Sequence, residues 1–145
     1  MDSQLPVTIL LVEDDAGHAL LIEKNLRRAG ITNDIITLDN GQKAVDFLLK
    51  EGEYQEDRRP IPLLILLDLN LPVLDGYQVL KIIKNNARTR QIPVVVLTTA
   101  DAPQEVARCY ELGCNVYVAK PVDYRQFSEA IRNLGLFLSI VKIPD

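Results

Sequence analysis

Acidic, hydroxyl and basic side chains follow four short apolar runs of this chain, and together they could form one charged site. The residues that follow the four runs are Glu13, Asp14 and Asp15, then Asp68 and, two positions later, Asn70, then Thr98 and Thr99, and finally Lys120, with Pro121 after it. Several ionised carboxylates need a counter-charge when they are crowded, because like charges raise each other's pKa. A hard divalent cation with oxygen ligands supplies it, and Mg²⁺ is the usual choice where phosphate is also handled. The set therefore predicts a magnesium site with phosphate chemistry.

Asp68 is the candidate nucleophile of this set. A carboxylate can attack phosphorus and form an aspartyl phosphate, and Asp68 ends the most apolar run, in the middle of the expected sheet. Phosphoryl transfer requires mainly positioning and stabilisation of charge on the phosphoryl oxygens. We expect the metal ion, the Lys120 ammonium and the Thr98 hydroxyl to provide that stabilisation. The expected metal ligands are Glu13, Asp14, Asp68 and the backbone carbonyl of Asn70.

The elements that must position these residues alternate between strand and helix. The expected strands are 8–12, 34–38, 63–67, 94–97 and 116–118, and the expected helices are 17–29, 41–49, 76–85, 103–112 and 124–138. The runs 9–12, 63–67 and 94–97 are continuously apolar, as strands covered on both faces are. The alternation predicts an α/β domain with a doubly wound, five-stranded parallel sheet. Ligands of such sheets bind beyond the carboxyl ends of the strands, where the candidate residues stand.

Helix ends and one long loop are also visible in the sequence. An apolar stripe at helical spacing, ending near Gly30, predicts the inner face of the first helix; its members are Ala19, Ile22, Leu26 and Ala29. Gly113 stands just past the fourth helix. The segment 50–62, KEGEYQEDRRPIP, is charged and carries two prolines, so we expect a surface loop.

Length and composition predict one globular domain over residues 1–145, with 139–145 as a C-terminal tail and no output domain. The chain is 48% hydrophobic and 25% charged. Its net charge of −4 argues against nucleic-acid binding. No apolar run approaches the roughly 20 residues that span a membrane. The polar start of the chain differs from a secretory signal, so we expect a cytoplasmic protein in which Cys109 and Cys114 are reduced thiols.

Four motifs resemble, in order, those of bacterial response-regulator receiver domains: ILLVEDD, ILLDLNLPVLDGYQVL, VVVLTTAD and YVAKPV. The resemblance covers residues 8–138, and Thr98 and Lys120 follow Asp68 by 30 and 52 residues, as in the family. It implies the flavodoxin-like receiver fold with strand order 2-1-3-4-5. It also implies a two-component signalling protein, not an enzyme, that is phosphorylated on Asp68 by a sensor histidine kinase. The implied switch pairs the Thr98 hydroxyl with the side chain of Tyr117, and output is through protein contacts or onward phosphotransfer.

Further segments resemble the small stand-alone receivers that are paired with phytochrome histidine kinases. These are DDAGHALLIEKNLRRAG, the charged loop before residues 60–62, RCYELGCNVYVAKPV and the closing LGLFLSIVKIP. This resemblance implies that the partner kinase is a phytochrome.

Other interpretations of the same residues stay open. Residues 13–15 taken alone could be a solvated turn that caps the first helix, and His18 is more typical of a surface residue than of a catalytic one. A phosphatase or dehalogenase-type hydrolase also uses an aspartate at a strand end, but it needs a second acid two residues later, where this chain has Asn70. A pseudo-receiver that serves only as a scaffold would be expected to lose the acid pair, Asp68 or Lys120.

The C-terminal segment carries more apolar residues than one helix face can bury. One stripe can pack on the sheet, and the remaining side chains, among them Phe137, Ile140 and Val141, have no obvious core to enter. They could fold back on their own domain, but contiguous apolar surface is seldom left bare on a monomer. We therefore expect a homodimer built on the fifth helix and the tail.

Overall fold

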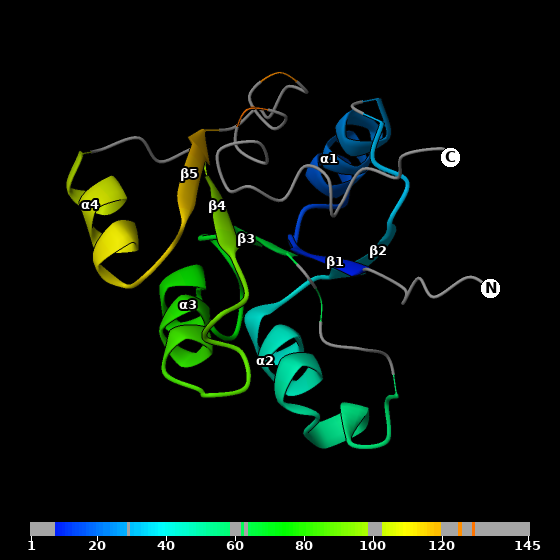
Figure 1. Cartoon of the computed structure of the whole chain (residues 1–145), viewed down its shortest axis with the longest axis vertical. Coiled ribbons are helices and arrows are strands. Elements are labelled where there is room, and N and C mark those ends of the chain that lie inside the picture. The colour runs from blue at the N-terminus through cyan, green and yellow to red at the C-terminus, as the bar shows by residue number, and fades with distance from the viewer. Residues whose placement is uncertain are drawn as a thin grey trace.

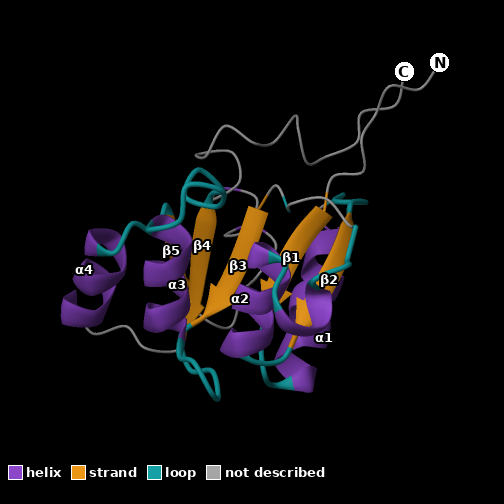
Figure 2. Cartoon of the chain, turned by 90° about the horizontal axis from the view of Figure 1, so that it is seen from below, coloured by secondary structure: helices purple, strands orange, loops and turns teal. Residues whose placement is uncertain are grey.

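Five parallel strands form one sheet in the order β2-β1-β3-β4-β5 (Figure 2). The computed structural model describes residues 8–28, 30–58, 62, 64–98, 103–119, 125 and 129. The strands are β1 (Thr8–Val12), β2 (Asp34–Leu38), β3 (Leu64–Asp68), β4 (Val94–Thr98) and β5 (Val116–Ala119). The expected strand order is confirmed. β1 and β2 have the predicted bounds. The last three strands each end one residue later than predicted, so that Asp68 is the last residue of β3.

Four α-helices alternate with the strands in the described part of the chain. They are α1 (Ala16–Arg28), α2 (Gly41–Leu49), α3 (Gly76–Lys84) and α4 (Pro103–Glu111). α1 lies on one face of the sheet, and α2 and α3 lie on the other (Figure 1). The helix predicted at 124–138 lies outside the described residues, except for Arg125 and Glu129.

Both faces of the central strands are buried, which explains their continuous apolar sequence. Alternate residues of one strand enter opposite cores, because side chains of a strand point to opposite faces in turn. On β1, Leu10 and Val12 pack in the core with α2 and α3, whereas Ile9 and Leu11 pack in the core with α1. Each fully buried side chain of this kind contributes about 1.5–3 kcal/mol relative to exposure. The sheet is therefore a rigid platform for the residues at its carboxyl edge.

The predicted stripe and stop of the first helix are confirmed for the residues that the structure describes. Ala19, Ile22 and Leu26 are buried on the inner face of α1. After the helix, Gly30 adopts φ +91°, and the Ile31 N–H donates to the carbonyl of Leu26 at 3.1 Å. This left-handed turn is the usual way in which a glycine satisfies the last carbonyls of a helix.

The segment 50–62 begins as a folded turn, which the sequence analysis did not predict. A 3₁₀ helix, η1 (Gly52–Tyr54), follows α2. The ring of Tyr54 meets Phe47 edge to face at 5.5 Å between centroids, and the Lys50 ammonium lies 3.7 Å from an Asp57 carboxylate oxygen. The first half of the loop is thus held against α2 by its own side chains.

The end of α4 buries both cysteines of the chain. Gly113 adopts φ +104°, as its predicted place past the helix requires, and the Cys114 N–H donates to the Cys109 carbonyl at 3.0 Å. Both thiols are free, as expected, and burial raises the pKa of Cys114 to about 12. The thiolate is the reactive form of cysteine, so neither the geometry nor the protonation state favours reactivity here. Among the described helices, none is long and apolar enough to cross a membrane.

Candidate functional site

The sheet register brings the acids that follow β1 beside the acid that ends β3. Val12 pairs with Leu67 across the two strands, so the next residue on each strand, Glu13 and Asp68, lies at the same level. The Glu13 N–H donates to the carbonyl of Leu38 at the end of β2, at 3.0 Å. The main chain at Glu13 is therefore held to the end of β2, next to the end of β3.

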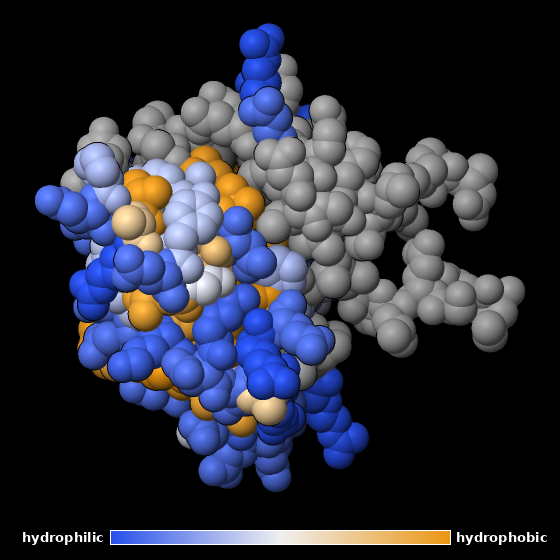
Figure 3. All heavy atoms as spheres, turned by 60° about the vertical axis from the view of Figure 1, so that its left-hand side comes forward, coloured by the Kyte–Doolittle hydropathy of each residue, from blue (hydrophilic) through white to orange (hydrophobic). Residues whose placement is uncertain are grey.

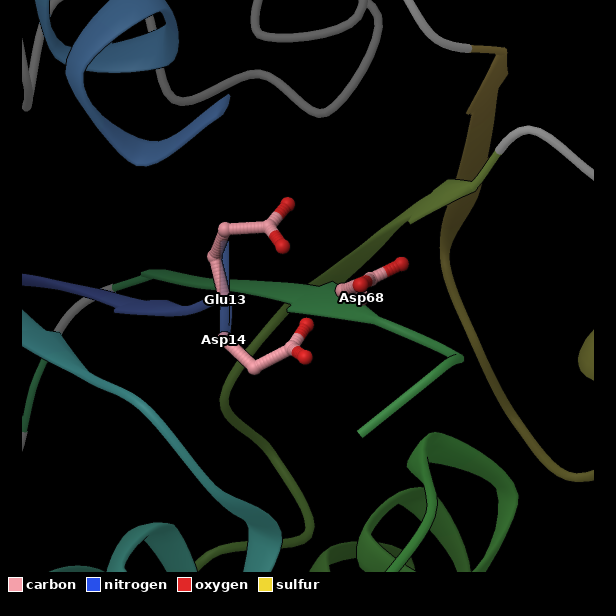
Figure 4. Close-up of side chains that lie close together, drawn as sticks. All are labelled: Glu13, Asp14 and Asp68. Carbon is pink, nitrogen blue, oxygen red and sulfur yellow. The ribbon is translucent and has the colours of Figure 1, made fainter. Parts of the chain in front are cut away.

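Glu13, Asp14 and Asp68 form a compact carboxylate cluster at this edge. One carboxylate oxygen from each residue lies within 4.8 Å of the others, and all three side chains stand at the carboxyl ends of β1 and β3 (Figure 4). Glu13 and Asp68 are only 2% and 4% exposed, whereas Asp14 is exposed to solvent. The prediction that these three acids come together is confirmed by this geometry.

The donor set fits a hard divalent cation. Three negative charges this close repel one another, and two of them are removed from water, which makes an uncompensated charge costly. Carboxylate oxygens are the ligands that Mg²⁺ and Mn²⁺ prefer, and an ion that keeps several waters needs a partly open site. The exposed position of Asp14 leaves such an opening.

The loop from β3 to α3 closes tightly over the main chain of Asp68. The Gly76 N–H donates to the Leu69 carbonyl at 2.8 Å, and Asp75 caps α3 through a capping box with Gln78. Asn70, whose carbonyl was predicted as a metal ligand, lies in this loop and is exposed. The loop also holds Val73 at φ +70°, a conformation that β-branched residues rarely adopt.

The other predicted site residues are placed only in part. Thr98 is the last residue of β4, one position beyond Leu97, which pairs with Asp68. Its backbone therefore lies at the same edge of the sheet as the carboxylates. Lys120 would follow β5 directly but lies outside the described residues, as do Phe137, Ile140 and Val141 of the expected dimer interface.

Tyr117, the predicted switch residue, lies in β5 and is linked to α4. Its side chain is half-buried, and its backbone N–H donates to the Tyr110 hydroxyl at 3.2 Å. α4 buries only Cys109 of its nine residues, and the side of the molecule that carries this helix shows apolar atoms among hydrophilic ones (Figure 3). Tyr110 was not predicted as a functional residue, because nothing in its spacing indicates a hydrogen bond to a later strand.

Asp15 has the capping role that was kept as an alternative for residues 13–15. Its carboxylate accepts a hydrogen bond from the His18 N–H at 2.9 Å. Asp15 is thus the N-cap of α1, while Glu13 and Asp14 belong to the cluster. The capping interpretation thus holds for Asp15, whereas metal binding by Glu13 and Asp14 stays a prediction that their place in the cluster supports.

Comparison with known proteins identifies the family. A family model described as the response regulator receiver domain matches residues 9–132. The chain belongs to this family. It is therefore a receiver domain of two-component signalling, and phosphorylation is implied by that membership.

Individual relatives match over almost the whole chain. Response regulator Rcp1 of Synechocystis sp. (strain ATCC 27184 / PCC 6803 / Kazusa) is 40% identical over 144 residues, which cover 99% of this chain and 97% of Rcp1. The probable methanogenesis regulatory protein FilR2 of Methanothrix harundinacea (strain 6Ac) is 39% identical over 135 residues, covering 92% of this chain and 84% of FilR2.

Solved structures agree with the fold and with a metal-binding family. The bacteriophytochrome response regulator RtBRR aligns with a TM-score of 0.86 at 39% identity, covering 97% of this chain and 85% of RtBRR. The Mn²⁺-bound form of Rcp1 aligns with a TM-score of 0.77 at 40% identity, covering 97% of this chain and all of that one. Receiver domains bind a divalent metal, and the carboxylate cluster of this chain fits one.

Proposed function

We propose that this protein accepts a phosphoryl group on Asp68 from a histidine of a sensor kinase, in a Mg²⁺-dependent reaction. The observation that carries the proposal is the cluster of Glu13, Asp14 and Asp68. Asp68 is the acceptor because it is the last residue of the central strand, where the sheet and the β3–α3 loop hold its main chain on both sides. A nucleophile held in this way approaches phosphorus at little cost in entropy.

Glu13, Asp14, Asp68 and the backbone carbonyl of Asn70 would hold the ion. When bound, Mg²⁺ supplies positive charge next to the phosphoryl oxygens. The acids and a carbonyl are hard oxygen donors, and the Mn²⁺-bound structure of Rcp1 supports a divalent ion in this family. Thr98 and Lys120, which follow the neighbouring strands in sequence, would stabilise the remaining oxygens.

The transfer step is a displacement at phosphorus. A carboxylate oxygen of Asp68 forms the new O–P bond, and the N–P bond of the phosphohistidine breaks. The electron pair of that bond returns to the imidazole nitrogen of the kinase, which takes up a proton. The chain positions the nucleophile and balances charge, which is most of what phosphoryl transfer demands of a protein.

The residue type at position 70 is unfavourable for the alternative function, a phosphatase or dehalogenase-type hydrolase. A phosphatase of the dehalogenase type would need a carboxylic acid at this position to protonate its leaving group. Asn70 cannot donate a proton in this way, and it lies exposed in the loop. A signalling role therefore fits this site better than turnover of a small substrate.

A small phosphodonor such as phosphoramidate tests the proposal without a kinase. Wild type incubated with phosphoramidate and Mg²⁺ should gain one phosphoryl group by intact mass spectrometry, and chelation of the metal should prevent the gain. Asp68→Asn should gain none. Asp75→Asn is the matched control, because it removes a carboxylate from the same loop but keeps an oxygen that can cap α3. Equal gain by Asp68→Asn and wild type would contradict the assignment.

A phytochrome is the kinase that we propose as the phosphate source. The support comes from RtBRR, described as a bacteriophytochrome response regulator, and from RcpA, described as a cyanobacterial phytochrome response regulator. FilR2 is 39% identical to this chain but is named as a methanogenesis regulatory protein. The test must therefore compare a phytochrome kinase with kinases of other sensor classes. Transfer from a purified phytochrome kinase should differ between its two light states. If kinases of other sensor classes transfer the phosphoryl group and the phytochrome kinase does not, this pairing is contradicted.

We also propose the output of the module. Phosphorylation would shift an existing equilibrium in which Tyr117 and Thr98 move together, altering the face formed by α4 and β5. The protein would work in the cytoplasm as a homodimer through its C-terminal segment, signalling by protein contacts or onward phosphotransfer. The excess of apolar residues between 136 and 143 supports the dimer.

A further inference from the structure

The turn between β1 and α1 donates a hydrogen bond to the carboxylate of Glu13. Glu13 is 2% exposed, so bulk water cannot satisfy its oxygens. One donor to this group is the backbone N–H of Asp15, which lies 3.1 Å from Oε2 of Glu13. A hydrogen bond to a buried carboxylate is charge-assisted and fixes its orientation. The contact thus selects one direction for the Glu13 carboxyl group.

The direction of the Asp15 N–H depends in turn on the side chain of Asp15. Its Oδ1 accepts from the His18 N–H at 2.9 Å, and its carbonyl accepts from the Ala19 N–H at 2.9 Å. These two bonds tie residue 15 to the first turn of α1, a helix of 13 residues. Gly17 leaves room for the cap, because a Cβ atom there would come within 3.2 Å of the same Oδ1.

Asp15 nevertheless stands apart from the carboxylates that could hold an ion. The cluster in the described part of the chain contains Glu13, Asp14 and Asp68 and leaves Asp15 out. Its carboxylate accepts a hydrogen bond from the helix, and its backbone N–H donates one to Glu13 of the cluster. Asp15 therefore acts on the site through another residue.

We propose that Asp15 is a positioning residue of the metal site. Its side chain caps α1, the cap aims its N–H at Oε2 of Glu13, and this hydrogen bond fixes the direction in which Glu13 presents its carboxylate to the cation. The inference rests on the proposed function, because it assumes that Glu13 helps to hold the ion. Groups that orient metal ligands in this way commonly change metal affinity by 10- to 100-fold.

A comparison of two variants with equal charge isolates this role. Asp15→Asn keeps an Oδ1 that can accept from His18, and Asp15→Ala has no acceptor. Both remove one negative charge, so a purely electrostatic contribution weakens both equally. Direct ligation by Asp15 also weakens both, because an amide is a poorer ligand than a carboxylate for Mn²⁺.

The measurement is the dissociation constant of the full chain for Mn²⁺, by water-proton relaxation after removal of bound metal. Asp15→Asn should stay within about threefold of wild type, and Asp15→Ala should bind roughly tenfold more weakly than Asp15→Asn. Thermal unfolding in chelator gives the temperature range in which every variant is folded, and titrations are made inside it. Asp15→Gly replaces Asp15→Ala if the latter does not fold, since glycine is tolerated at an N-cap and also lacks the acceptor.

Asp14→Ala is the control that separates this inference from the proposed function. It should weaken Mn²⁺ binding strongly, because the site has few carboxylates. Unchanged affinity in Asp14→Ala would overturn the metal site itself. A second outcome would overturn only the role of Asp15. In that outcome Asp14→Ala binds Mn²⁺ more weakly than wild type, but Asp15→Asn and Asp15→Ala bind it with equal affinity, either that of wild type or one reduced to the same extent.

Discussion

The main chain of Gly76 lies directly against the main chain of Asp68. A Cβ atom at Gly76 would stand 2.4 Å from the carbonyl oxygen of Asp68 and 2.5 Å from the Cα of Leu69. Real Cβ atoms do not approach backbone atoms this closely, so only glycine permits the contact. The start of α3 and the end of β3 are therefore locked together next to the proposed phosphorylation site. This contact links the helix on one face of the sheet to the position of the proposed nucleophile, Asp68.

Gly76→Ala should destabilise the protein and disturb the carboxylate cluster. Overpacking against backbone commonly costs about 1–3 kcal/mol, and here neither partner is a flexible side chain. Urea unfolding should show a loss at the upper end of that range, and Mn²⁺ affinity should fall because the main chain of Asp68 is displaced. Gly30→Ala is the control, since nothing lies within 4 Å of a Cβ there and only its positive φ is strained. Unchanged Mn²⁺ affinity in folded Gly76→Ala would separate this contact from the site.

A substitution at Val73 should stabilise the protein. Its φ of +70° and its exposed fraction of 75% place a β-branched side chain in a strained conformation without burial in return. Val73→Asn should raise the free energy of unfolding by about 1 kcal/mol, because asparagine tolerates the left-handed region. Val73→Thr keeps the branched shape and should gain nothing. Chemical denaturation of the three proteins decides, and equal stability of the Asn and Thr variants would show that strain is absent.

Tyr110 should hold α4 to the strand that carries Tyr117. Tyr110→Phe removes the hydroxyl that accepts from the Tyr117 N–H, which should cost about 1 kcal/mol locally. Hydrogen exchange at the Tyr117 amide should become faster, while exchange in β1 stays the same. Tyr77→Phe provides the control: the Arg108 guanidinium, 4.2 Å from the Tyr77 ring centroid, can still stack on phenylalanine. Identical exchange at Tyr117 in all three proteins would refute the link.

The proposed dimer predicts that charge in the C-terminal segment produces a monomer. Burial of Phe137, Ile140 and Val141 across a two-fold axis could contribute about 1.5–3 kcal/mol per side chain before the cost of association. The double variant Phe137→Glu and Val141→Glu would place like charges together there and should dissociate the dimer. Analytical ultracentrifugation at equal micromolar concentrations compares the two. A wild type that already sediments as a monomer would mean that the segment serves its own domain.

The elements and the carboxylate cluster were accessible to sequence analysis because each depends on local patterns. The continuous apolar runs at β1 and β3 can be satisfied only between two helical layers, and parallel strands bring the following acids to one edge. The motif resemblance supplied the strand order. What these patterns share is a fixed spacing along the chain.

The features that were missed depend on contacts without such spacing. η1 forms because Tyr54 turns back onto Phe47 and because Lys50 and Gly52 adopt positive φ, and no run of the sequence indicates this. The link from Tyr110 to Tyr117 depends on how α4 lies beside β5. The part of Asp15 in orienting Glu13 required the hydrogen bonds themselves.

Direct localisation of the phosphoryl group tests the central claim most sharply. Wild type phosphorylated with phosphoramidate in the presence of Mg²⁺ is reduced with borohydride, which converts an aspartyl phosphate to homoserine, and the peptides are then sequenced by mass spectrometry. We predict homoserine at position 68 and unmodified aspartate at positions 14, 15 and 75. Homoserine at Asp14 or Asp15, with Asp68 unmodified, would contradict the assignment of Asp68 as the phosphoacceptor.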